Sequence, residues 1–411
     1  MQAQNKSVEA HTHGVGRWLV LAGVWLIYFS FGITIASMAP LIGPISAELG
    51  IGNATMGLVL GAWPLTYIVA AIPCGILLDR FGARKMLFAA TIVMAASGLT
   101  RSVADTPMEL LLAVGLFGAG GPMISVGAPK LIAALFEGRD RGTAMGIYVT
   151  GPYLGGIVAL ALTNSVLLPL VDGDWRGVML VYAGLVALSG LVWLTLSAPR
   201  FSPAQRAGTE GGKKFNFSAF ADILILPEVR LILLMSIGIF FINHAMNNWL
   251  PEILRSREFT SVAAGYWSAL PAAVGIVGAI IVPRLATPNR RLTILAILFL
   301  CALVASLLLH SNLAPLLATG LILQGLARGA MMTVAILILM ETPNVPPERL
   351  GLAGGLFFTT AEVGGVLGPI TFGFLSAMSG GFTLPLVSIT LVCIGLCVLL
   401  WLLRRMHTQP R

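Results

Sequence analysis

Long apolar runs separated by short polar segments fill the chain. Twelve runs of about 20 residues or more lie at 18–43, 54–77, 86–104, 109–136, 143–169, 177–197, 229–251, 262–285, 292–310, 313–340, 351–377 and 382–403. Only helices and closed barrels satisfy their backbone hydrogen bonds in hydrocarbon, and nothing here alternates apolar and polar residues as barrel strands do. The pattern therefore predicts an all-α membrane protein with twelve transmembrane helices.

The composition agrees with a membrane protein and argues against a soluble one. The chain of 411 residues is 57% hydrophobic and 10% charged, whereas a soluble chain carries about 25% charged residues. The first run is longer than the apolar region of a signal peptide and has no convincing cleavage site after it. We therefore expect this run to be retained as the first helix.

The positions of lysine and arginine predict the orientation. If both termini face the cytoplasm, the outer loops carry only four of the 25 basic residues, Arg101, Arg176, Arg255 and Arg257. An excess of basic residues inside indicates an N-in/C-in topology. This excess also explains the net charge of +8 without nucleic acid as a partner. We expect a multi-pass protein embedded in the lipid bilayer of a cell membrane, the inner membrane in a bacterium.

The longest hydrophilic stretch divides the runs into two sets of six. It predicts a cytoplasmic N-terminal tail at 1–16, an N-terminal six-helix bundle at 17–198, a cytoplasmic linker at 199–228, a C-terminal six-helix bundle at 229–403 and a cytoplasmic tail at 404–411. The halves repeat weakly, since Gly155-Gly156 is matched by Gly364-Gly365 at an offset of 209 residues. Duplicated halves are typical of transporters, with the substrate site near mid-membrane between them.

Two loop and helix motifs carry a family resemblance. The segment after the second run reads Gly75-Ile76-Leu77-Leu78-Asp79-Arg80-Phe81-Gly82-Ala83-Arg84-Lys85 and resembles motif A of the major facilitator superfamily, with Ala83 as its one departure. The fifth run contains Gly151-Pro152-Tyr153-Leu154-Gly155-Gly156, which resembles the motif C of that family. With the twelve runs, the linker and the half-repeat, the resemblance covers the whole chain. It implies two pseudo-symmetric six-helix bundles that transport a solute by alternating access.

The resemblance also implies a gate at motif A. Asp79 is expected to pair with a neighbouring helix and its dipole, next to Arg80 and Arg84, and so to hold the cytoplasmic side closed. Gly75 and Gly82 would let the helix ends approach closely. The alternative is that this acid and these cations only fix the topology. The glycines of the fifth and eleventh runs are expected to let the two halves pack and rock.

Three charged residues are clear candidates for charges within the membrane: Lys130, Arg328 and Glu362. A charge at the bilayer centre costs at least ~2.5–3.5 kcal/mol on insertion scales, so it normally faces a cavity or a partner. In the resembled family helices 1, 4, 7 and 10 line the central cavity, which would bring Lys130 and Arg328 to a shared anion, with Gln324 one turn from Arg328. Alternatively, Lys130 reaches the inner headgroups, and Arg328 forms a purely structural ion pair with Glu362.

The seventh and eleventh runs add candidate coupling residues. Asn243 and Asn247 share one helix face and His244 and Asn248 the next, which suggests a hydrated cavity. His244 could titrate near neutral pH. Glu362 is a candidate proton carrier, because its protonation would release Arg328 to bind the anion. A static ion pair at Glu362, or hydrogen bonds between helices along the seventh run, would be equally consistent with the sequence.

Remaining polar and aromatic positions are weaker candidates. Thr34 and Tyr67 could form part of a cavity wall, although packing and interfacial anchoring are the commoner uses of such residues. The four cysteines have no accompanying His or acid, so we expect no metal site. Without a phosphate-binding loop or a clustered catalytic set, neither ATP-driven transport nor an enzyme is expected. The energy source would be an ion gradient of protons rather than a cofactor.

The resulting prediction is a secondary transporter for a small organic or inorganic anion, acting as a symporter or antiporter. The segment Asn248-Trp249-Leu250-Pro251-Glu252-Ile253-Leu254 is similar to the cyanate and nitroimidazole branch of the superfamily. The alternative is a multidrug efflux proton antiporter, which would rest on the motif-C-like segment and an aromatic cavity. A monomer is sufficient for alternating access.

Overall fold

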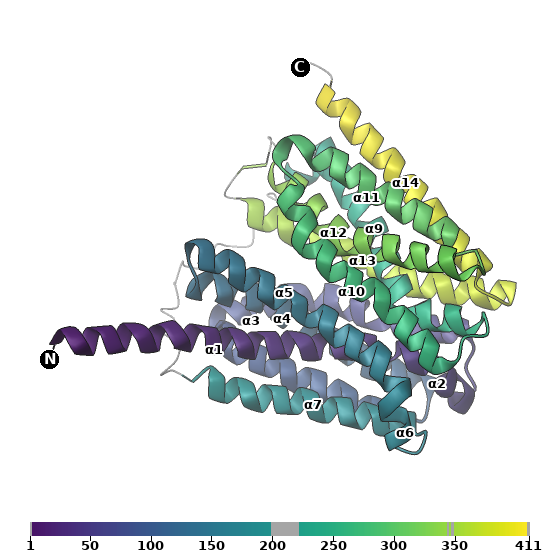
Figure 1. Ribbon diagram of the computed structural model, residues 1–411, viewed down its shortest axis with the longest axis horizontal. Coiled ribbons are helices and arrows are strands. Elements are labelled where there is room, and N and C mark those ends of the chain that lie inside the picture. Colours follow the sequence, from purple (N-terminus) through teal and green to yellow (C-terminus); the bar gives the residue numbers. More distant parts are fainter. Residues whose placement is uncertain (1, 199–221, 343–344, 347–348, 409–411) are drawn as a thin grey trace. The chain divides into compact units, whose positions relative to one another are not determined.

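The protein is all-helical throughout the residues that its structure, a computed structural model, describes: 2–198, 222–342, 345–346 and 349–408 (Figure 1). The helices are α1 (Gln2–Ala36), η1 (Ala39–Leu41), α2 (Ile42–Leu49), α3 (Asn53–Ser102), α4 (Pro107–Leu135), α5 (Gly138–Leu162), η2 (Thr163–Leu167), α6 (Leu168–Leu170), α7 (Trp175–Leu196), α9 (Pro227–Arg255), α10 (Ser261–Leu285), η3 (Pro288–Arg290), α11 (Arg291–Leu308), α12 (Ala314–Met340), α13 (Leu350–Ser379) and α14 (Thr383–Thr408). Most of the predicted linker, residues 199–221, lies outside the described residues.

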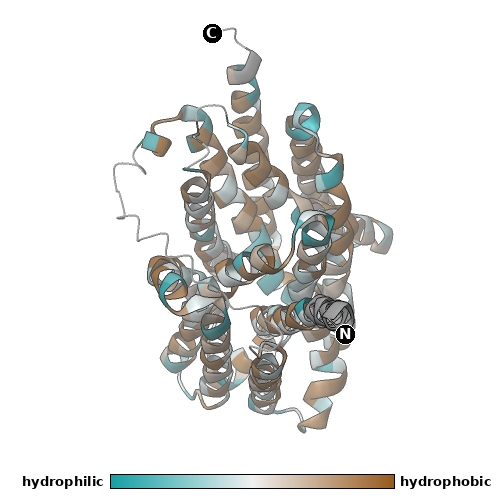
Figure 2. Ribbon diagram, turned by 90° about the vertical axis from the view of Figure 1, so that its left-hand side faces the viewer, coloured by the Kyte–Doolittle hydropathy of each residue, from teal (hydrophilic) through white to brown (hydrophobic). Residues whose placement is uncertain are grey.

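Eleven helices in the described part of the chain are long and apolar enough to cross a membrane. Apolar residues make up most of the length of these helices (Figure 2). The prediction of a multi-span helical protein is therefore confirmed. Helix α3 accounts for two of the predicted runs, because its 50 residues would extend for ~75 Å at 1.5 Å per residue, more than twice the ~30 Å hydrocarbon core.

The break inside α3 lies at Gly82. This residue has φ 79° and ψ 157°, a backbone conformation that residues with a Cβ rarely adopt. The helix therefore changes direction at a glycine, and the segments on either side correspond to the second and third predicted runs. Glycine is favoured at position 82 of the motif-A-like segment because the turn requires a positive φ there.

Local sequence signals explain where several helices begin. Thr106 and Glu109 form a capping box at α4: the Thr106 hydroxyl accepts from the Glu109 backbone N–H at 3.2 Å, and the Glu109 carboxylate accepts from the Thr106 backbone N–H. At α7, Asp174 accepts from the backbone N–H groups of Arg176 and Gly177. These side chains satisfy N–H groups that have no partner within the first helical turn.

The chain forms two compact units. Unit 1 comprises Met1–Met38 and Val69–Gly212, and unit 2 comprises Ala39–Ile68 and Lys213–Arg411. This division differs from the predicted bundles in one respect, because residues 39–68, which precede the linker, are grouped with the second unit. Helix α3 consequently contributes its first 16 residues to unit 2 and the remainder to unit 1.

Glycines bring helix backbones into close contact within each unit. In unit 1 a Cβ added to Gly155 of α5 would collide with the backbone carbonyl of Phe29 in α1. In unit 2 a Cβ added to Gly364 of α13 would collide with the carbonyl of Ile237 in α9. The expectation that these glycines pack the two halves against each other is corrected here: in the structure they pack α5 on α1 and α13 on α9, inside the separate units (Figure 1).

Contacts between the start of α3 and α13 account for the membership of residues 53–68 in unit 2. The side-chain amide of Asn53 donates to the hydroxyl of Ser376 at 2.8 Å. An added Cβ at Gly57 would lie 2.7 Å from the carbonyl oxygen of Pro369, and one at Gly373 would collide with the carbonyl of Asn53. The backbones of the two helices are therefore in direct contact. As a result Trp63 and Tyr67 of α3 belong to unit 2.

Candidate functional site

A guanidinium held by two amides lies at the centre of the candidate site in unit 2. Nε of Arg328 on α12 donates to Oδ1 of Asn243 on α9 at 2.9 Å. Its Nη2 donates to the backbone carbonyl of Asn243 at 3.2 Å and to Oδ1 of Asn247. Asn243 and Asn247 are one turn apart, so both amides face the same side of α9. These contacts orient the guanidinium but carry no charge of their own.

Gln324 adds an unsatisfied acceptor one turn before Arg328. The residue is 3% exposed, and its Oε1 has no hydrogen-bond partner among the described residues. Leaving such a group buried without a donor costs about 1–3 kcal/mol. A hydroxyl or amide donor of a bound solute would remove this penalty. The sequence placed Gln324 and Arg328 on one face of a helix, and Arg328 contacts α9 through Asn243 and Asn247.

The second polar pair of unit 2 joins α9 to α13. Nε2 of His244 lies 3.7 Å from Oε2 of Glu362, and the two residues are 8% and 5% exposed. Within the described part of the chain, neither Nδ1 of His244 nor Oε2 of Glu362 has a hydrogen-bond partner. A buried acid and a buried base that face each other at this distance can hold one proton between them after a small approach.

The absence of a side chain at Gly365 provides the space that the His244–Glu362 pair occupies. A Cβ added there would lie 2.5 Å from Oε2 of Glu362 and 3.0 Å from Nδ1 of His244. Any side chain at this position would push the carboxylate or the imidazole away. The repeated glycine pair at 364–365 thus has two separate uses, since Gly364 packs the helices and Gly365 accommodates the acid and the base.

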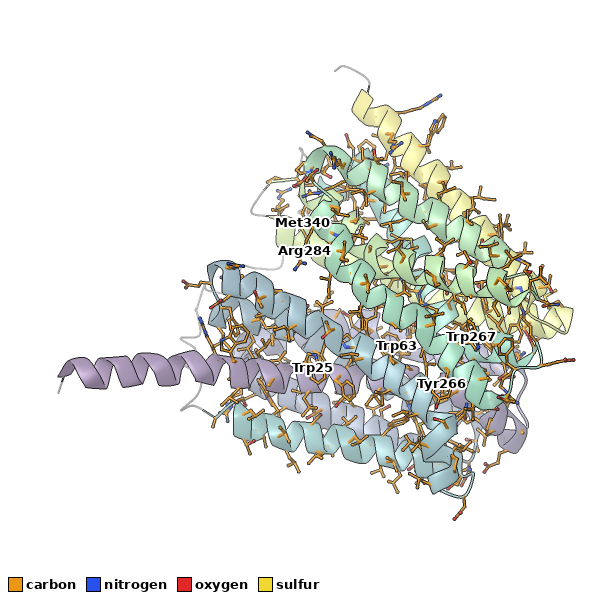
Figure 3. All side chains as sticks on the ribbon, viewed as in Figure 1. Trp25, Trp63, Tyr266, Trp267, Arg284 and Met340 are labelled. Carbon is orange, nitrogen blue, oxygen red and sulfur yellow. The ribbon has the colours of Figure 1, made fainter. Side chains whose placement is uncertain are left out.

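Two aromatic rings enclose the imidazole of His244. The indole of Trp63 stacks on it with ring centroids 5.0 Å apart and an interplanar angle of 21°, and Phe240 lies at 5.6 Å and 24°. Trp63 comes from α3, in the segment that belongs to unit 2, and is 6% exposed (Figure 3). Tyr67 follows one turn later and is also buried. The rings shield the His244–Glu362 pair from water.

Thr34 lies in the other unit and has a different role from the one expected. Its hydroxyl donates to the carbonyl of Ser30 at 2.9 Å, and its own carbonyl accepts from Arg101 at 3.3 Å. Because Thr34 is 5% exposed and its hydroxyl hydrogen is already used within α1, the structure gives no support for Thr34 as a wall of the substrate cavity.

Lys130 is paired with the acid of the motif-A-like segment. Its Nζ lies 2.5 Å from Oδ1 of Asp79, and the two side chains are 57% and 73% exposed. The expected pairing of Asp79 with a neighbouring helix is thereby identified as a contact from α3 to α4. An ammonium engaged at an exposed helix end is a poor candidate for a buried anion clamp, so the geometry favours Arg328 over Lys130 as the binding cation.

The other residues of this segment attach α3 to its surroundings. Nε of Arg84 donates to the Ser197 hydroxyl at 3.1 Å, and the Arg84 carbonyl accepts from the indole of Trp193 at 3.0 Å. The guanidinium of Arg80 lies 5.3 Å from the ring centroid of Phe81. At Gly75 an added Cβ would meet no described atom within 4 Å.

One cation was assigned to the wrong environment by the sequence. Arg101 was expected in an outer loop, but it ends α3 inside unit 1 and is 1% exposed. The signal was present in the hydropathy, since the run at 86–104 includes this residue. The roles of Trp63 and Gly365 gave no comparable signal, because they depend on partners from other helices.

The site combines an oriented cation, an unsatisfied amide acceptor and a shielded acid–base pair. Positive charge with planar donors suits a carboxylate or a similar oxyanion, while the acceptor suits a hydroxyl group on the same solute. No group of three or more His, Cys, Asp and Glu side chains suited to a metal ion occurs in the described residues. The arrangement is chemically able to hold a polar anion and a proton.

The chain is similar over most of its length to a known family and to several known transport proteins. The model of the Major Facilitator Superfamily matches residues 24–316 and 287–411. The probable galactarate/D-glucarate transporter GudP of Escherichia coli (strain K12) is 22% identical over 452 aligned residues, covering 98% of this chain and 97% of that protein. The quinolone resistance transporter of Acinetobacter baumannii is 24% identical over 393 residues, covering 89% of each. A crystal structure of the nucleoside transporter NupG aligns with a TM-score of 0.77 at 16% identity, over 94% of this chain and 99% of that one, which shows the fold.

Proposed function

The chain belongs to the Major Facilitator Superfamily, and from that premise we propose that it carries a small organic anion across the membrane by alternating access. The single observation that supports an anion most directly is the guanidinium of Arg328, which two asparagines of α9 orient without neutralising it. An arginine keeps its charge in any protein environment. Its stabilisation inside an apolar helix is simplest if the transported solute carries the opposite charge.

The proposed topology has twelve crossings with both termini in the cytoplasm. The turn at Gly82 supports it, because it divides the 50 residues of α3 into two segments that each approach or exceed the length of one crossing. The distribution of Lys and Arg supports the orientation. In a bacterium the corresponding location is the inner membrane, and a monomer is a sufficient functional unit.

The proposed solute is a polyhydroxylated or otherwise polar carboxylate. Arg328 would bind the carboxylate, and the unsatisfied oxygen of Gln324 would accept from a hydroxyl or amide of the solute. The name of the Escherichia coli relative describes substrates that are sugar diacids, which combine these two features. An aldarate or aldonate is therefore the first class of compound to test.

Proton coupling is proposed through His244 and Glu362 rather than through competition at Arg328. The carboxyl of Glu362 faces His244, whereas the guanidinium of Arg328 contacts Asn243 and Asn247. Asn243 and His244 are neighbours in sequence, so an anion that binds at Arg328 would favour an added proton on the adjacent pair. This arrangement corresponds to symport of an anion with a proton.

Ligand-dependent thermal unfolding of the purified protein tests the anion proposal. A ligand that binds only the folded state raises the unfolding temperature, so galactarate, glucarate and galactonate are expected to stabilise the wild type in a saturable manner. Arg328→Gln should lose this effect. The control variant, Arg290→Gln, removes an equal charge from an exposed position and should keep it.

The alternative function, drug efflux, predicts the opposite pattern. The similarity to the quinolone resistance transporter supports this alternative. A pump for apolar or cationic drugs would be stabilised by such drugs, would not respond to the acids, and would tolerate Arg328→Gln. Stabilisation by drugs alone, unchanged in that variant, would contradict the anion proposal.

A further inference from the structure

A buried arginine lies in unit 1, away from every residue proposed above to bind the transported solute. Arg101, near the end of α3, is 1% exposed, and its Nε has no hydrogen-bond partner within the described residues. Its Nη1 makes two long contacts, 3.3 Å to the Thr34 carbonyl and 3.4 Å to the Ser37 hydroxyl oxygen. A group with five N–H donors is therefore only partly satisfied in this interior.

The charge of Arg101 has no acidic counterpart in contact with it. No carboxylate oxygen of the described residues lies within 4.0 Å of its guanidinium nitrogens. The neighbouring acid in the chain, Asp105, is exposed and pairs with Arg176 at 2.9 Å. The ring of Phe117, whose centroid is 5.7 Å from the guanidinium carbon, supplies a partial compensation. A buried charge normally has a partner of opposite sign.

A small cavity adjoins this guanidinium. It has a volume of about 10 Å³, which is room for roughly one water-sized guest. Its lining includes Thr34 of α1, Ser37 directly after α1, Arg101 of α3 and Tyr182 of α7. Two methionines, Met94 and Met179, complete much of the remaining wall. A monatomic ion fits such a space, whereas an organic anion of several atoms does not.

The hydroxyl groups around the cavity already donate hydrogen bonds to other protein atoms. Ser37 donates to the Thr34 carbonyl at 2.9 Å, and Thr34 donates to the Ser30 carbonyl at 2.9 Å. The Thr163 hydroxyl donates to the Ala159 carbonyl at 2.5 Å, so in its 2.6 Å contact with Tyr182 the tyrosine is the donor. The unsatisfied group of the cavity wall is thus a donor with a positive charge, which suits an anion better than a neutral water.

Tyr182 connects the cavity to an irregularity in the helix that follows α5. Thr163 begins η2, a five-residue π-helical turn, and its hydroxyl receives the hydrogen bond of Tyr182. Single π-helical turns are rare and occur frequently at functional sites. Residues of α1, α3, α7 and η2 therefore form a polar cluster inside unit 1.

We propose that unit 1 binds one monatomic inorganic anion, of the size of chloride, against Arg101 in this cavity. The anion accepts from the guanidinium, supplies the missing negative charge, and contacts the residues of α1, α3 and α7 that line the cavity. The site is independent of the carrier proposal for Arg328, because its lining residues all belong to the other unit.

Thermal unfolding of the full-length protein in detergent tests this site. The unfolding temperature is measured as sodium chloride replaces sodium gluconate at constant ionic strength. The wild type is expected to gain a few degrees in a saturable manner, and bromide should act like chloride. Arg101→Gln should lose the dependence on chloride, and Arg328→Gln and Arg290→Gln should both retain it. Loss of the dependence in Arg328→Gln instead would place the anion at the solute site and overturn the proposal.

A second readout does not depend on the stability of a variant. In crystals of the wild type grown with bromide, an anomalous peak is expected beside the guanidinium of Arg101. If chloride and gluconate give equal unfolding temperatures, if Arg101→Gln keeps the chloride dependence, or if crystals show only a water at this position, the cavity holds no anion and the proposal is wrong. Should Arg101→Gln not fold, Arg101→Lys, which keeps the charge but removes the planar donors, is expected to bind chloride more weakly.

Discussion

Nε of Arg328 donates to the side-chain oxygen of Asn243 across the interface of α12 and α9, at 2.9 Å. This contact helps to stabilise a charged residue within an apolar helix. The amides of Asn243 and Asn247 fix the direction of the guanidinium, and a fixed cation loses less conformational entropy when an anion binds. Affinity should therefore depend on the asparagines almost as strongly as on the arginine.

Replacement of Asn243 by alanine should weaken anion binding about tenfold or more, because one or two hydrogen bonds to a charged group are lost, at about 1.5–3 kcal/mol each. The measurement is a titration of the stabilising acid followed by the shift in unfolding temperature. Asn312→Ala, which alters an exposed loop residue, is the matched control and should bind normally. Equal affinities of the two variants would mean that the asparagine does not orient Arg328.

Replacement of Glu362 by glutamine should uncouple transport from the proton gradient. The amide preserves the size of the side chain near His244 but cannot exchange a proton. In proteoliposomes, accumulation driven by an inward proton gradient should disappear, while exchange of labelled for unlabelled solute should persist. Glu137→Gln, at an exposed position that begins α5, should leave both activities intact. Gradient-driven accumulation by Glu362→Gln would exclude this residue as the proton carrier.

Replacement of Gly365 by alanine should damage the acid–base pair directly. The added methyl group would lie 2.5 Å from Oε2 of Glu362 and 3.0 Å from Nδ1 of His244, so one of them must move, at a cost of about 1–3 kcal/mol. We expect a lower unfolding temperature and loss of gradient-driven transport. Gly395→Ala is the matched control, since a Cβ there meets no described atom within 4 Å and alanine favours the helix. A fully active, stable Gly365→Ala protein would contradict this packing.

Replacement of Gly82 by alanine should destabilise the turn in α3. Its φ of 79° is unfavourable for any residue with a Cβ, and the strain is about 1–3 kcal/mol. Gly75→Ala changes the same motif-like segment at a helical position with open space around it and should be neutral or slightly stabilising. A lower unfolding temperature in Gly82→Ala alone would show that the positive φ requires glycine. Lower unfolding temperatures in both variants would mean that this segment tolerates no substitution of glycine by alanine.

Hydropathy and local motifs predicted the helical class well. Each span is a property of about 20 consecutive residues, so the predicted runs correspond to helices, and the turn at Gly82 lies between two of them. The grouping of residues 39–68 with unit 2 could not be predicted in this way. It depends on contacts such as Asn53 with Ser376, which are 323 positions apart in the chain.

Side-chain partners were harder to predict than side-chain locations. The sequence correctly identified Lys130, Arg328 and Glu362 as charges within apolar runs, but helical periodicity does not determine which residues of other helices they meet. Lys130 meets Asp79, and Glu362 meets His244. For Arg101 the location itself was predicted wrongly. Its position near the end of an apolar run suggested a loop, but its side chain is buried.

The allocation of Trp63 to unit 2 has a consequence for the assembly of the protein. A polypeptide that began after the linker would contain His244 and Glu362 but would lack the indole that stacks on His244. It would also lack the α3 backbone at Asn53 and Gly57 that packs against Gly373 of α13. The ribosome delivers residues 39–68 before any of their partners in the later helices exist. Residues 39–68 therefore cannot form their contacts with α13 until α13 has been synthesised. Correct insertion of the last helices is then required for unit 2 to fold completely.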